Sequence, residues 1–463
     1  MGEDLQREEL MISQDCSVAV IGAGIVGIAA AHALSVRHGR RDVLLIDPNP
    51  PMSLTSACSG ENYRNWWPHP TMTAFTDDSI ALMEDIAGQS GNRINMTRRG
   101  YALCTRASGE SLIEELHWGY GESAASHIRV HDAGATGTYQ PPLTEAWETA
   151  PLGVDVVRDQ ALIRQTFPSF ADDIAMVIHI RRAGDISGQQ LGQFMLEQFR
   201  DSGGRIVTGA VVGVEQDTAF TLDLKTSEGV QQVRADMIVN AAGPFVGVIA
   251  SLVDIKLPVV NVLQQKIAFE DRDGCVPRDM PFAIDLDGQS IDWSDEEREM
   301  LQDDPQTDWL TRPMPGAIHC RPDGGGRWIK LGWAYNQAQT APAWEPYLDP
   351  AFREIVLRGA ARLNPALKAY YGRLPRNISH YGGFYTMTEE NWPLIGPMGA
   401  EGAFVVGALS GFGTMAACAA GKLCAAWVTG SDLPDYAADL SLQRYENGPL
   451  MTDLSALQSK GVL

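Results

Sequence analysis

The stretch CSVAVIGAGIVGIAAAHAL, residues 16–34, decides the fold. Its apolar run VAVI (18–21) is typical of a short buried strand. Gly22, Gly24 and Gly27 follow in the pattern G-x-G-x-x-G and lead into an alanine-rich segment typical of a helix. In such a turn the first glycine permits the bend, the second lets the backbone approach a pyrophosphate, and the third lets the helix pack on the strand. We therefore predict a nucleotide site at the start of this helix.

A second apolar run, DVLLID (42–47), ends in an acidic residue and is followed by a proline. Strand, glycine turn, helix, strand and terminal acid in this order indicate a Rossmann-like dinucleotide-binding unit. The carboxylate would accept hydrogen bonds from a ribose, and it disfavours a 2′-phosphate, so FAD or NAD is expected rather than NADP. The predicted nucleotide contacts are Gly22, Gly24, Ile25, Val26, Gly27, Asp47 and Pro48.

The composition is that of a soluble globular protein. The chain has 463 residues, of which 44% are hydrophobic and 20% charged, enough for two or three domains. Its formal charge of −22 argues against nucleic acid and against anionic membrane surfaces as partners. No run approaches the ~18 apolar residues of a membrane span, and the polar start lacks the parts of a signal peptide. The seven cysteines are scattered without a CxxC, and no metal-site spacing occurs among the histidines, so we expect a cytoplasmic protein without a metal.

Three later stretches add to the fingerprint. ADMIVNAAGPFVG (235–247) is an apolar strand that runs into small residues, and GGFYTMTEENWPLIGPMG (382–399) begins as an aromatic strand. AFVVGALSGFGTMAACAAGKLCAAWVTG (403–430) indicates a strand, a glycine-rich turn and a helix of small residues. Gly411 and Gly413 leave backbone N–H groups bare at the start of that helix, which predicts an anion site supported by the helix dipole.

With these stretches in this order, the chain resembles the D-amino-acid-oxidase-like FAD-dependent oxidoreductases, and within them the sarcosine oxidase and glycine oxidase group. The resemblance covers nearly the whole chain and implies FAD as the cofactor. It also implies an α/β fold, in which a discontinuous Rossmann-like FAD-binding domain carries a smaller α+β substrate domain built on a mixed sheet. The further cofactor contacts that it implies are Ser59, Gly60, Arg64, Val211, Ala241, Ala242, Gly243, Gly383, Tyr385, Gly411, Phe412, Gly413 and Thr414.

The expected domains are discontinuous. The FAD-binding domain comprises 1–90, 165–250 and 378–463, and the substrate domain comprises 91–164 and 251–377, with strands at 262–269 and 327–335. The acidic segment 285–309 resembles an insertion, which we expect to form a lid over the active site or a subunit contact. Within it, Ser294 and Glu297 have the spacing of a capping box and predict a short helix.

The stretch GGGRWIKLGWAYN (324–336) carries the candidate catalytic lysine. Alternation along a strand places Ile329 and Leu331 on one face and Lys330 on the other. In sarcosine oxidase a lysine in a K-L-G stretch lies over the flavin and helps to activate oxygen, and the resemblance assigns this role to Lys330. It also implies that Arg64 lies beside the isoalloxazine ring. A fixed cation in a low-dielectric site would stabilise the superoxide that forms there.

Three departures from the sarcosine oxidase pattern concern the ends of the site. The cysteine that tethers the flavin falls at Gly383, so non-covalent FAD is expected. The lysine that helps to hold the substrate carboxylate falls at Met415, and a histidine of the site falls at Ala334. A methionine cannot pair with a carboxylate, so we expect a substrate larger and more apolar than sarcosine. The predicted substrate contacts are Trp66, Trp67, His69, Tyr381 and Met415.

The resemblance thus implies an FAD-dependent amine or amino-acid oxidase. A hydride passes from the substrate to the flavin, the imine hydrolyses in water, and O₂ takes up the electrons to give H₂O₂. Three alternatives stay open: a dehydrogenase that passes electrons to a quinone or carrier, a 2-hydroxy-acid oxidoreductase, and a non-enzymatic flavin-binding subunit. The sequence names neither the substrate nor its stereochemistry, and it leaves homo-oligomerisation open.

Overall fold

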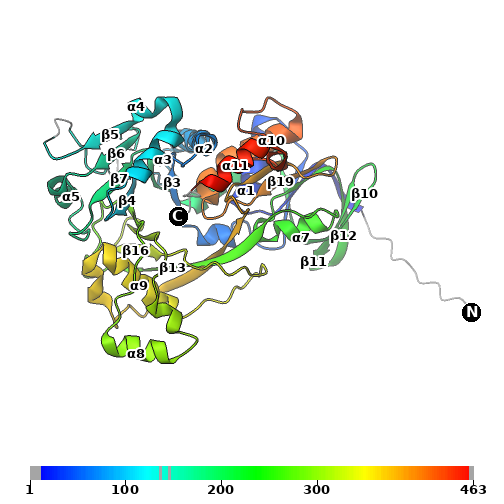
Figure 1. Ribbon diagram of the computed structural model, residues 1–463. Coiled ribbons are helices and arrows are strands. Elements are labelled where there is room, and N and C mark those ends of the chain that lie inside the picture. Colours follow the sequence, from blue (N-terminus) through cyan, green and yellow to red (C-terminus); the bar gives the residue numbers. More distant parts are fainter. Residues whose placement is uncertain (1–11, 135–137, 144–146, 458–463) are drawn as a thin grey trace, which may run out of the picture.

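The computed structural model describes residues 12–134, 138–143 and 147–457, in which two large sheets lie side by side (Figure 1). The first sheet has eight strands in the order β10-β11-β12-β1-β2-β9, with β19 beside β12 and β18 beside β19. Its strands β12, β1, β2 and β9 are parallel neighbours, with β9 at the edge, as in a Rossmann-like sheet. The strands are β1 (Ile12–Ile21), β2 (Val43–Asp47), β9 (Arg205–Thr208), β10 (Ala210–Gln216), β11 (Phe220–Thr226), β12 (Gly229–Asn240), β18 (Leu394–Pro397) and β19 (Ala403–Gly407).

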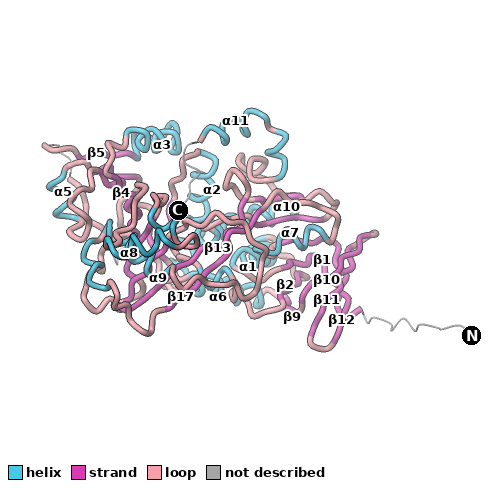
Figure 2. Tube along the Cα trace, turned by 60° about the horizontal axis from the view of Figure 1, so that its bottom comes forward, coloured by secondary structure: helices cyan, strands magenta, loops and turns pink. Residues whose placement is uncertain are grey.

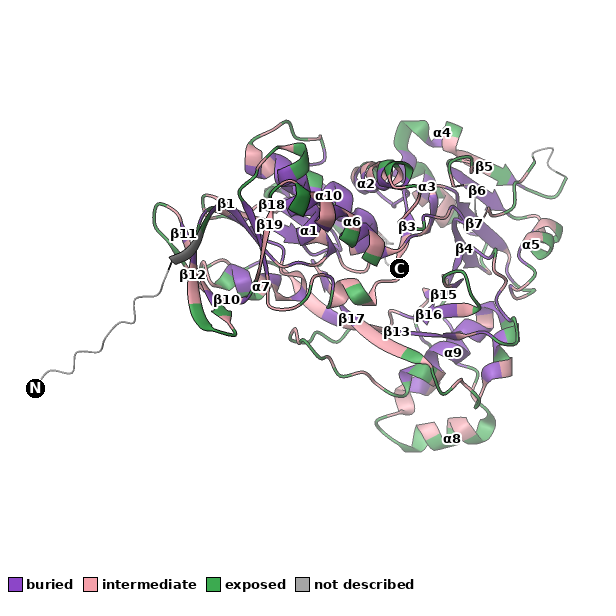
Figure 3. Ribbon diagram, turned by 180° about the vertical axis from the view of Figure 1, so that it is seen from behind, coloured by how far each residue is buried: buried purple, intermediate pink, exposed green. Residues whose placement is uncertain are grey.

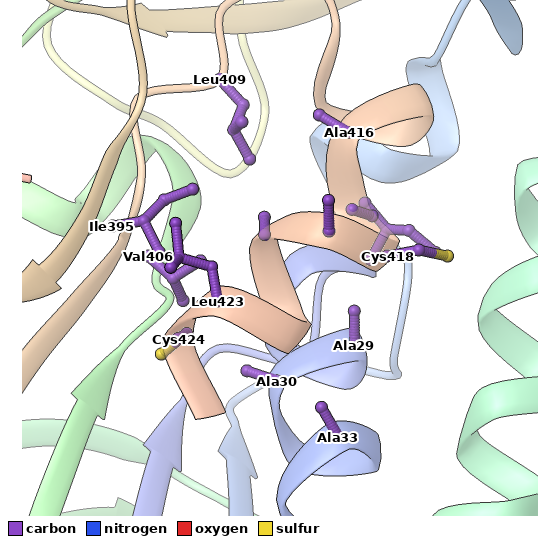
Figure 4. Close-up of a cluster of buried hydrophobic side chains, with 14 of the residues drawn as sticks. Ala29, Ala30, Ala33, Ile395, Val406, Leu409, Ala416, Cys418, Leu423 and Cys424 are labelled. Carbon is purple, nitrogen blue, oxygen red and sulfur yellow. The ribbon is translucent and has the colours of Figure 1, made fainter. Parts of the chain in front are cut away.

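Helices lie in two layers on one side of this sheet. The strands are contacted by α1 (Ile25–His32) and α10 (Gly413–Thr429), both rich in small residues, whereas α6 (Gly188–Asp201) packs on α1 and α2 (Pro70–Gln89) packs on α10. In Figure 4, Ala29, Ala30 and Ala33 of the first helical segment face the small side chains of α10. The two helices approach so closely that a Cβ on Gly421 would overlap the backbone of Ala29. The small side chains therefore allow α1 and α10 to bring their N-termini to the same cleft.

The second sheet has nine strands in the order β17-β13-β16-β15-β14-β4-β7-β6-β5. It is mixed, since β14 with β4 and β5 with β6 are parallel whereas β13, β15, β16 and β17 pair antiparallel. Helix α9 (Phe352–Leu363) packs on one face against β13, β15 and β16. The strands are β4 (Tyr101–Thr105), β5 (Ile128–His131), β6 (Val154–Val157), β7 (Met176–Ile180), β13 (Val260–Glu270), β14 (Phe282–Asp285), β15 (Ile318–Pro322), β16 (Trp328–Gly332) and β17 (Ser379–Met387).

The two sheets confirm the predicted α/β fold with a Rossmann-like part and a mixed second sheet. The division into domains stays a prediction, but two strands depart from its boundaries. β7 lies in the nine-stranded sheet because it pairs with β4 and β6, and β17 lies there because it pairs with β13 along its whole length. In Figure 3, β13 and β17 run between the two halves of the molecule. A short ribbon of β3 (Asn62–Arg64) and β8 (Ala183–Asp185) lies apart from both sheets.

The acidic segment forms the predicted helix, α8 (Asp295–Asp303). Its capping box is present: the Ser294 hydroxyl accepts from the Glu297 N–H, and the Glu297 carboxylate accepts from the Ser294 N–H. No residue of α8 is buried, and Figure 3 shows the helix at the periphery. Its role as a lid or subunit contact stays a prediction. The other helices include α3 (Glu110–Tyr120), α5 (Gln160–Thr166), α7 (Val246–Ser251) and α11 (Gly448–Ala456), which Figure 2 labels, and α4 (Ala124–His127), which Figure 1 labels. Within the ranges that the structure describes, none of the helices is long and apolar enough to span a membrane.

Candidate functional site

The glycine turn after β1 has the geometry that a bound nucleotide requires. Gly22 has a φ of +110°, and a Cβ there would overlap the carbonyl of Ala241 at the end of β12. A Cβ on Gly27 would overlap the Gly22 carbonyl, so α1 can pack on the turn only with glycine at this position. Gly24 is different, because the atom nearest to a Cβ there is the Ser56 hydroxyl oxygen, at 3.2 Å. Its open side faces the space where a phosphate would bind at the start of α1.

Asp47, at the end of β2, lies at one end of this space. Its Oδ2 accepts from the Ala23 N–H at 2.7 Å, and its Oδ1 accepts from the Asn49 N–H at 2.8 Å. Burial raises the pKa of this carboxyl, although both hydrogen bonds oppose the shift. A carboxylate has about four lone-pair positions, so two remain for ribose hydroxyls.

Two adjoining cavities form one elongated cleft from Asp47 to the N-terminus of α10. The first holds about 770 Å³, part of it open to solvent, and the second about 430 Å³. They share Gly24, Ala241 and Gly243, which places the fingerprint turn at the middle of the cleft. Of the predicted cofactor contacts, the first cavity is lined by Gly24, Ile25, Val26, Ser59, Gly60, Ala241, Gly243, Gly383, Tyr385, Gly411, Gly413 and Thr414, and the second by Gly22, Asp47 and Ala242.

The N-terminus of α10 closes the far end of the cleft. The helix begins at Gly413, and the Thr414 hydroxyl is 2.8 Å from that of Ser59. The ring of Tyr385 packs so closely on Gly411 that a Cβ there would collide with it. Backbone N–H groups and the helix dipole make this end suitable for a group that gains negative charge. The cleft therefore fits a long dinucleotide, with an acid for ribose at one end, a phosphate turn in the middle and an anion-stabilising helix end at the other.

The aromatic residues expected at the substrate do not line either cavity. Trp67 is 1% exposed and packs edge-on against Phe412 at 4.7 Å, and His69 packs against the Trp392 ring at 4.8 Å. Trp66 lies in a separate buried cluster with Tyr101. These rings fill the core beside α2. They therefore do not form the aromatic wall of a substrate pocket that the sequence predicted.

Met415 also lies in the core rather than at the cleft. Its side chain is 1% exposed and belongs to the cluster between α1 and α10. The residue follows Thr414, which does line the cavity, but the helix turns it away from the cleft. The argument that a methionine here makes the substrate pocket apolar therefore loses its structural basis.

Five predicted cofactor contacts lie outside the two cavities, namely Arg64, described below, and four others. Gly27 packs on the turn, Phe412 on Trp67, and Val211 belongs to the edge strand β10, while Pro48 follows Asp47 away from the cavity wall. Gly27, Pro48 and Phe412 each adjoin a residue that lines a cavity, so spacing along the chain could not separate them from wall residues, whereas no residue of β10 lines either cavity.

Arg64 is buried in an aromatic cage. Its guanidinium carbon lies 5.0 Å from the ring centre of Trp67, 5.8 Å from that of Trp66 and 5.6 Å from that of Tyr101. Burial lowers its pKa to about 10. Stacking on aromatic faces is a common environment of arginine, and it places this cation behind the cavity wall rather than on it.

Lys330 lies on the predicted strand with the predicted alternation. Ile329 and Leu331 are fully buried under α9, and Lys330 points from the opposite face of β16. Its Nζ is 3.4 Å from Glu61 Oε2 and 3.4 Å from Asp323 Oδ1. Burial and the neighbouring Arg321 lower its pKa, and the two carboxylates oppose this shift. Lys330 does not line either cavity; its Nζ meets Glu61, which follows the wall residues Ser59 and Gly60 in the chain.

The cation that does line the cavity is Lys266, on β13, which the sequence analysis did not single out. It lies opposite Tyr381 in β17, and its Nζ is 5.4 Å from the ring centre of Tyr385. The strand itself was predicted, but alternation alone does not say which face of a mixed sheet meets a ligand. Tyr381 has a raised pKa because it is buried, and it lies beside this cleft without lining either cavity. Cys58 is a second wall residue that the analysis missed.

A family model described as FAD dependent oxidoreductase matches residues 17–427. A glycine oxidase from Geobacillus kaustophilus is 16% identical with a TM-score of 0.68, covering 93% of this chain and 99% of that one. An L-proline dehydrogenase from P. horikoshii is 16% identical with a TM-score of 0.69, covering 94% and 99%. An iminodiacetate oxidase from Chelativorans sp. BNC1 is 18% identical with a TM-score of 0.66, covering 92% and 98%. A search of curated protein sequences finds no match.

Proposed function

The chain belongs to the FAD dependent oxidoreductase family, and from this premise we propose that it oxidises the C–N bond of an amino acid or related amine. A hydride leaves the substrate carbon that bears the nitrogen, and the resulting imine hydrolyses in water. FAD, when bound, would supply the redox chemistry: it would take up the hydride, and its two electrons would reduce O₂ to H₂O₂ with the uptake of protons. The observation that carries the proposal is the elongated cleft, which runs from Asp47 to the N-terminus of α10 and is lined there also by Lys266 and Tyr385 of the nine-stranded sheet.

In this proposal the chain holds the cofactor at three places. Gly22, Gly24 and the first N–H groups of α1 bind the pyrophosphate, and the free lone pairs of Asp47 accept from ribose hydroxyls. The first N–H groups of α10, beside Thr414, face the end of the flavin that gains negative charge on reduction. Donors fixed there in advance stabilise that charge without rearranging during the reaction.

A dehydrogenase of the same fold is the second candidate, and one observation favours it. The positive charge of Lys330 is offset by Glu61 and Asp323, which weakens its effect on a nascent superoxide. One of the structural neighbours is an L-proline dehydrogenase, although the likeness extends only to the fold. O₂ uptake and reduction of an artificial dye, measured side by side with one substrate, separate the two candidates.

The proposed function is tested by exposing the FAD-loaded protein to three panels: amino acids, amines and 2-hydroxy acids. Anaerobic bleaching of the flavin reports hydride transfer, and peroxide release in air reports the use of O₂. We expect bleaching by members of the first or second panel, followed by peroxide. Bleaching only by 2-hydroxy acids would contradict oxidation of a C–N bond, and a protein that binds no FAD would contradict the proposal as a whole.

A further inference from the structure

The face of the nine-stranded sheet that meets the cleft carries a group of cations. Lys266 lies opposite Gly332 in the pairing of β13 with β16, and Lys330 lies opposite Arg321 in the pairing of β16 with β15. Directly opposed residues in an antiparallel pair share a face, and so do residues two apart on one strand. Lys266, Lys330 and Arg321 therefore share one face, and the apolar face behind them packs on α9.

Two of these three cations have carboxylate partners. Arg321 Nη1 lies 2.9 Å from Asp323 Oδ1, and Lys330 Nζ lies 3.4 Å from both Asp323 Oδ1 and Glu61 Oε2. Arg321 also donates to the carbonyl of Gly60 at 2.9 Å. Arg321 Nη1 also lies 3.8 Å from Asp185 Oδ2, so these two cations are surrounded by three carboxylates and have no need of a further anion.

Lys266 is the third cation, and its surroundings are different. Its residue is 6% exposed, and its side chain reaches the cavity wall beside Tyr385, Gly60 and Cys58. Across the described part of the chain, no carboxylate oxygen lies within the 4.0 Å of an ion pair with its Nζ. Taking a charge out of water without a partner is costly. The site is therefore built to receive an anion from outside the chain.

The neighbouring titratable groups do not supply that anion. Burial raises the pKa of the Cys58 thiol, so it stays neutral around pH 7. Burial and the nearby Lys266 lower the pKa of His319 to about 3, so this ring carries no charge at neutral pH. Lys266 is thus the uncompensated charge at this part of the cavity wall.

We propose that Lys266 binds the carboxylate of the substrate, so that the substrate class is amino acids rather than amines without a carboxylate. The inference rests on the proposed function and names the substrate class for the same site. The N-terminus of α10 is a second place for an anion in the same cavity: the Tyr385 ring lies against Gly411, and the centre of that ring is 5.4 Å from Lys266 Nζ. One site serves the cofactor and the other the substrate. A carboxylate held at Lys266 also orients the adjacent carbon in the cleft.

Equilibrium binding to the FAD-loaded protein tests this without turnover. The probes are acetate, propionate and benzoate, with benzamide as the uncharged counterpart of benzoate, and binding is followed by the shift of the flavin absorbance. The variants are Lys266→Met and Lys266→Arg, and the matched control is Lys225→Met, which removes an exposed lysine on β11 of the other sheet. FAD content and melting temperature are recorded for each variant.

We expect benzoate to bind at least ~10-fold more weakly to Lys266→Met, since a hydrogen bond to a charged group is worth about 1.5–3 kcal/mol and every 1.4 kcal/mol is tenfold. Lys266→Arg and Lys225→Met should stay within about threefold of the unmodified protein, and benzamide should not respond to any variant. In turnover, kcat/KM for an amino acid should fall in Lys266→Met far more than that for the amine of the same side chain.

Any of three results overturns the proposal. The first is unchanged benzoate affinity in a fully FAD-loaded Lys266→Met protein, and the second is no binding of any carboxylate probe to the unmodified protein. The third is loss of FAD from both Lys266 variants, which would assign the lysine to the cofactor. If carboxylate binding depends on Lys266 but no amino acid or amine bleaches the flavin, the anion site stands and the proposed oxidation of a C–N bond fails.

Discussion

Two lysines on adjacent strands show how the role of a residue depends on its partners. Lys330 and Lys266 are both buried on the same face of one sheet, but among the residues that the structure describes carboxylates lie within ion-pairing distance of Lys330 alone of the two. In a low-dielectric environment such partners offset most of the field of a charge. The K-L-G stretch identifies Lys330 by resemblance, whereas the position on the cavity wall belongs to Lys266.

Because Lys330 is paired with carboxylates, we predict that removing its charge has a modest effect on the reaction with O₂ and a larger effect on the free energy of unfolding. Replacing it by methionine leaves Glu61 and Asp323 with Arg321 alone, and breaking a buried pair costs about 3–5 kcal/mol where no second cation remains. We expect Lys330→Met to lower the free energy of unfolding by about 1–3 kcal/mol in urea titrations. Reoxidation by O₂ in stopped flow should slow by less than ~10-fold. A loss of ~10²-fold confined to that half-reaction, the size typical of a direct contact, would restore the role implied by resemblance.

The open space beside Gly24 predicts that a side chain at this position prevents FAD binding. Gly24→Val places a branched side chain in the space that the phosphate needs, beside the Ser56 hydroxyl. We expect largely apoprotein, measured as the ratio of flavin to protein absorbance after purification. Gly88→Val is the control, because a Cβ at this position of α2 meets no atom within 4 Å. Stoichiometric FAD in Gly24→Val would place the nucleotide elsewhere.

At the scale of elements, β17 meets a short turn after β2 at the cavity wall. A Cβ on Gly383 would lie 3.2 Å from the Cβ of Cys58, which belongs to the 3₁₀ turn Thr55–Cys58. In sarcosine oxidase this position of the strand carries the cysteine that tethers the flavin. Here the strand has Gly383 instead, and the neighbouring thiol belongs to Cys58 of the turn. The chemistry of the strand therefore depends on its neighbour as well as on its own residues.

We expect the FAD to be non-covalent despite this thiol. Burial raises the pKa of Cys58, and a protonated thiol is a poor nucleophile. Acid precipitation should release all of the yellow colour into the supernatant. Flavin that stays with the precipitated chain, and is lost in Cys58→Ser, would identify Cys58 as a tether and contradict the prediction.

At the scale of the whole molecule, buried neutral histidines link stability to pH. His179 accepts from the Tyr139 hydroxyl at Nδ1 and donates from Nε2 to the Arg99 carbonyl, at 2.8 Å and 2.9 Å. Burial lowers the pKa of His179, like that of His319, to about 3. Between about pH 3 and the ordinary value of 6.5 the unfolded chain binds these protons and the folded chain does not. Their contribution is therefore complete above pH 6.5 and is lost progressively below it.

Each such histidine contributes a slope of up to ~1.4 kcal/mol per pH unit in that window. We expect His179→Asn to be less stable at pH 7 and to show a smaller fall in the free energy of unfolding between pH 6 and pH 4.5. His117→Asn, on the exposed side of α3, is the control and should keep the full slope. Urea titrations at four pH values measure both. Equal slopes in all three proteins would show that His179 titrates normally in the fold.

The sequence by itself determined what local spacing can determine. Gly22 is required by the bend and Gly27 by close packing. The place of Asp47 at the nucleotide site was predicted because it is the last residue of an apolar strand. Alternation assigned Ile329 and Lys330 to opposite faces, and the Ser294 capping box predicted α8. These features arise within a few residues, from backbone geometry and side-chain direction, so no knowledge of distant contacts was needed.

Only the tertiary structure decided which of these faces meets the cleft. Lys330 is neutralised by Glu61, which is 269 residues away in the chain, and Trp67 is turned into the core by Phe412 of a remote turn. Lys266 reaches the cavity because β13 pairs with β17 on one side and β16 on the other. Alternation in the sequence of a strand tells which residues share a face, but not what each face contacts. Which face receives a ligand, a carboxylate or the core is set by elements that pack on it from elsewhere in the chain.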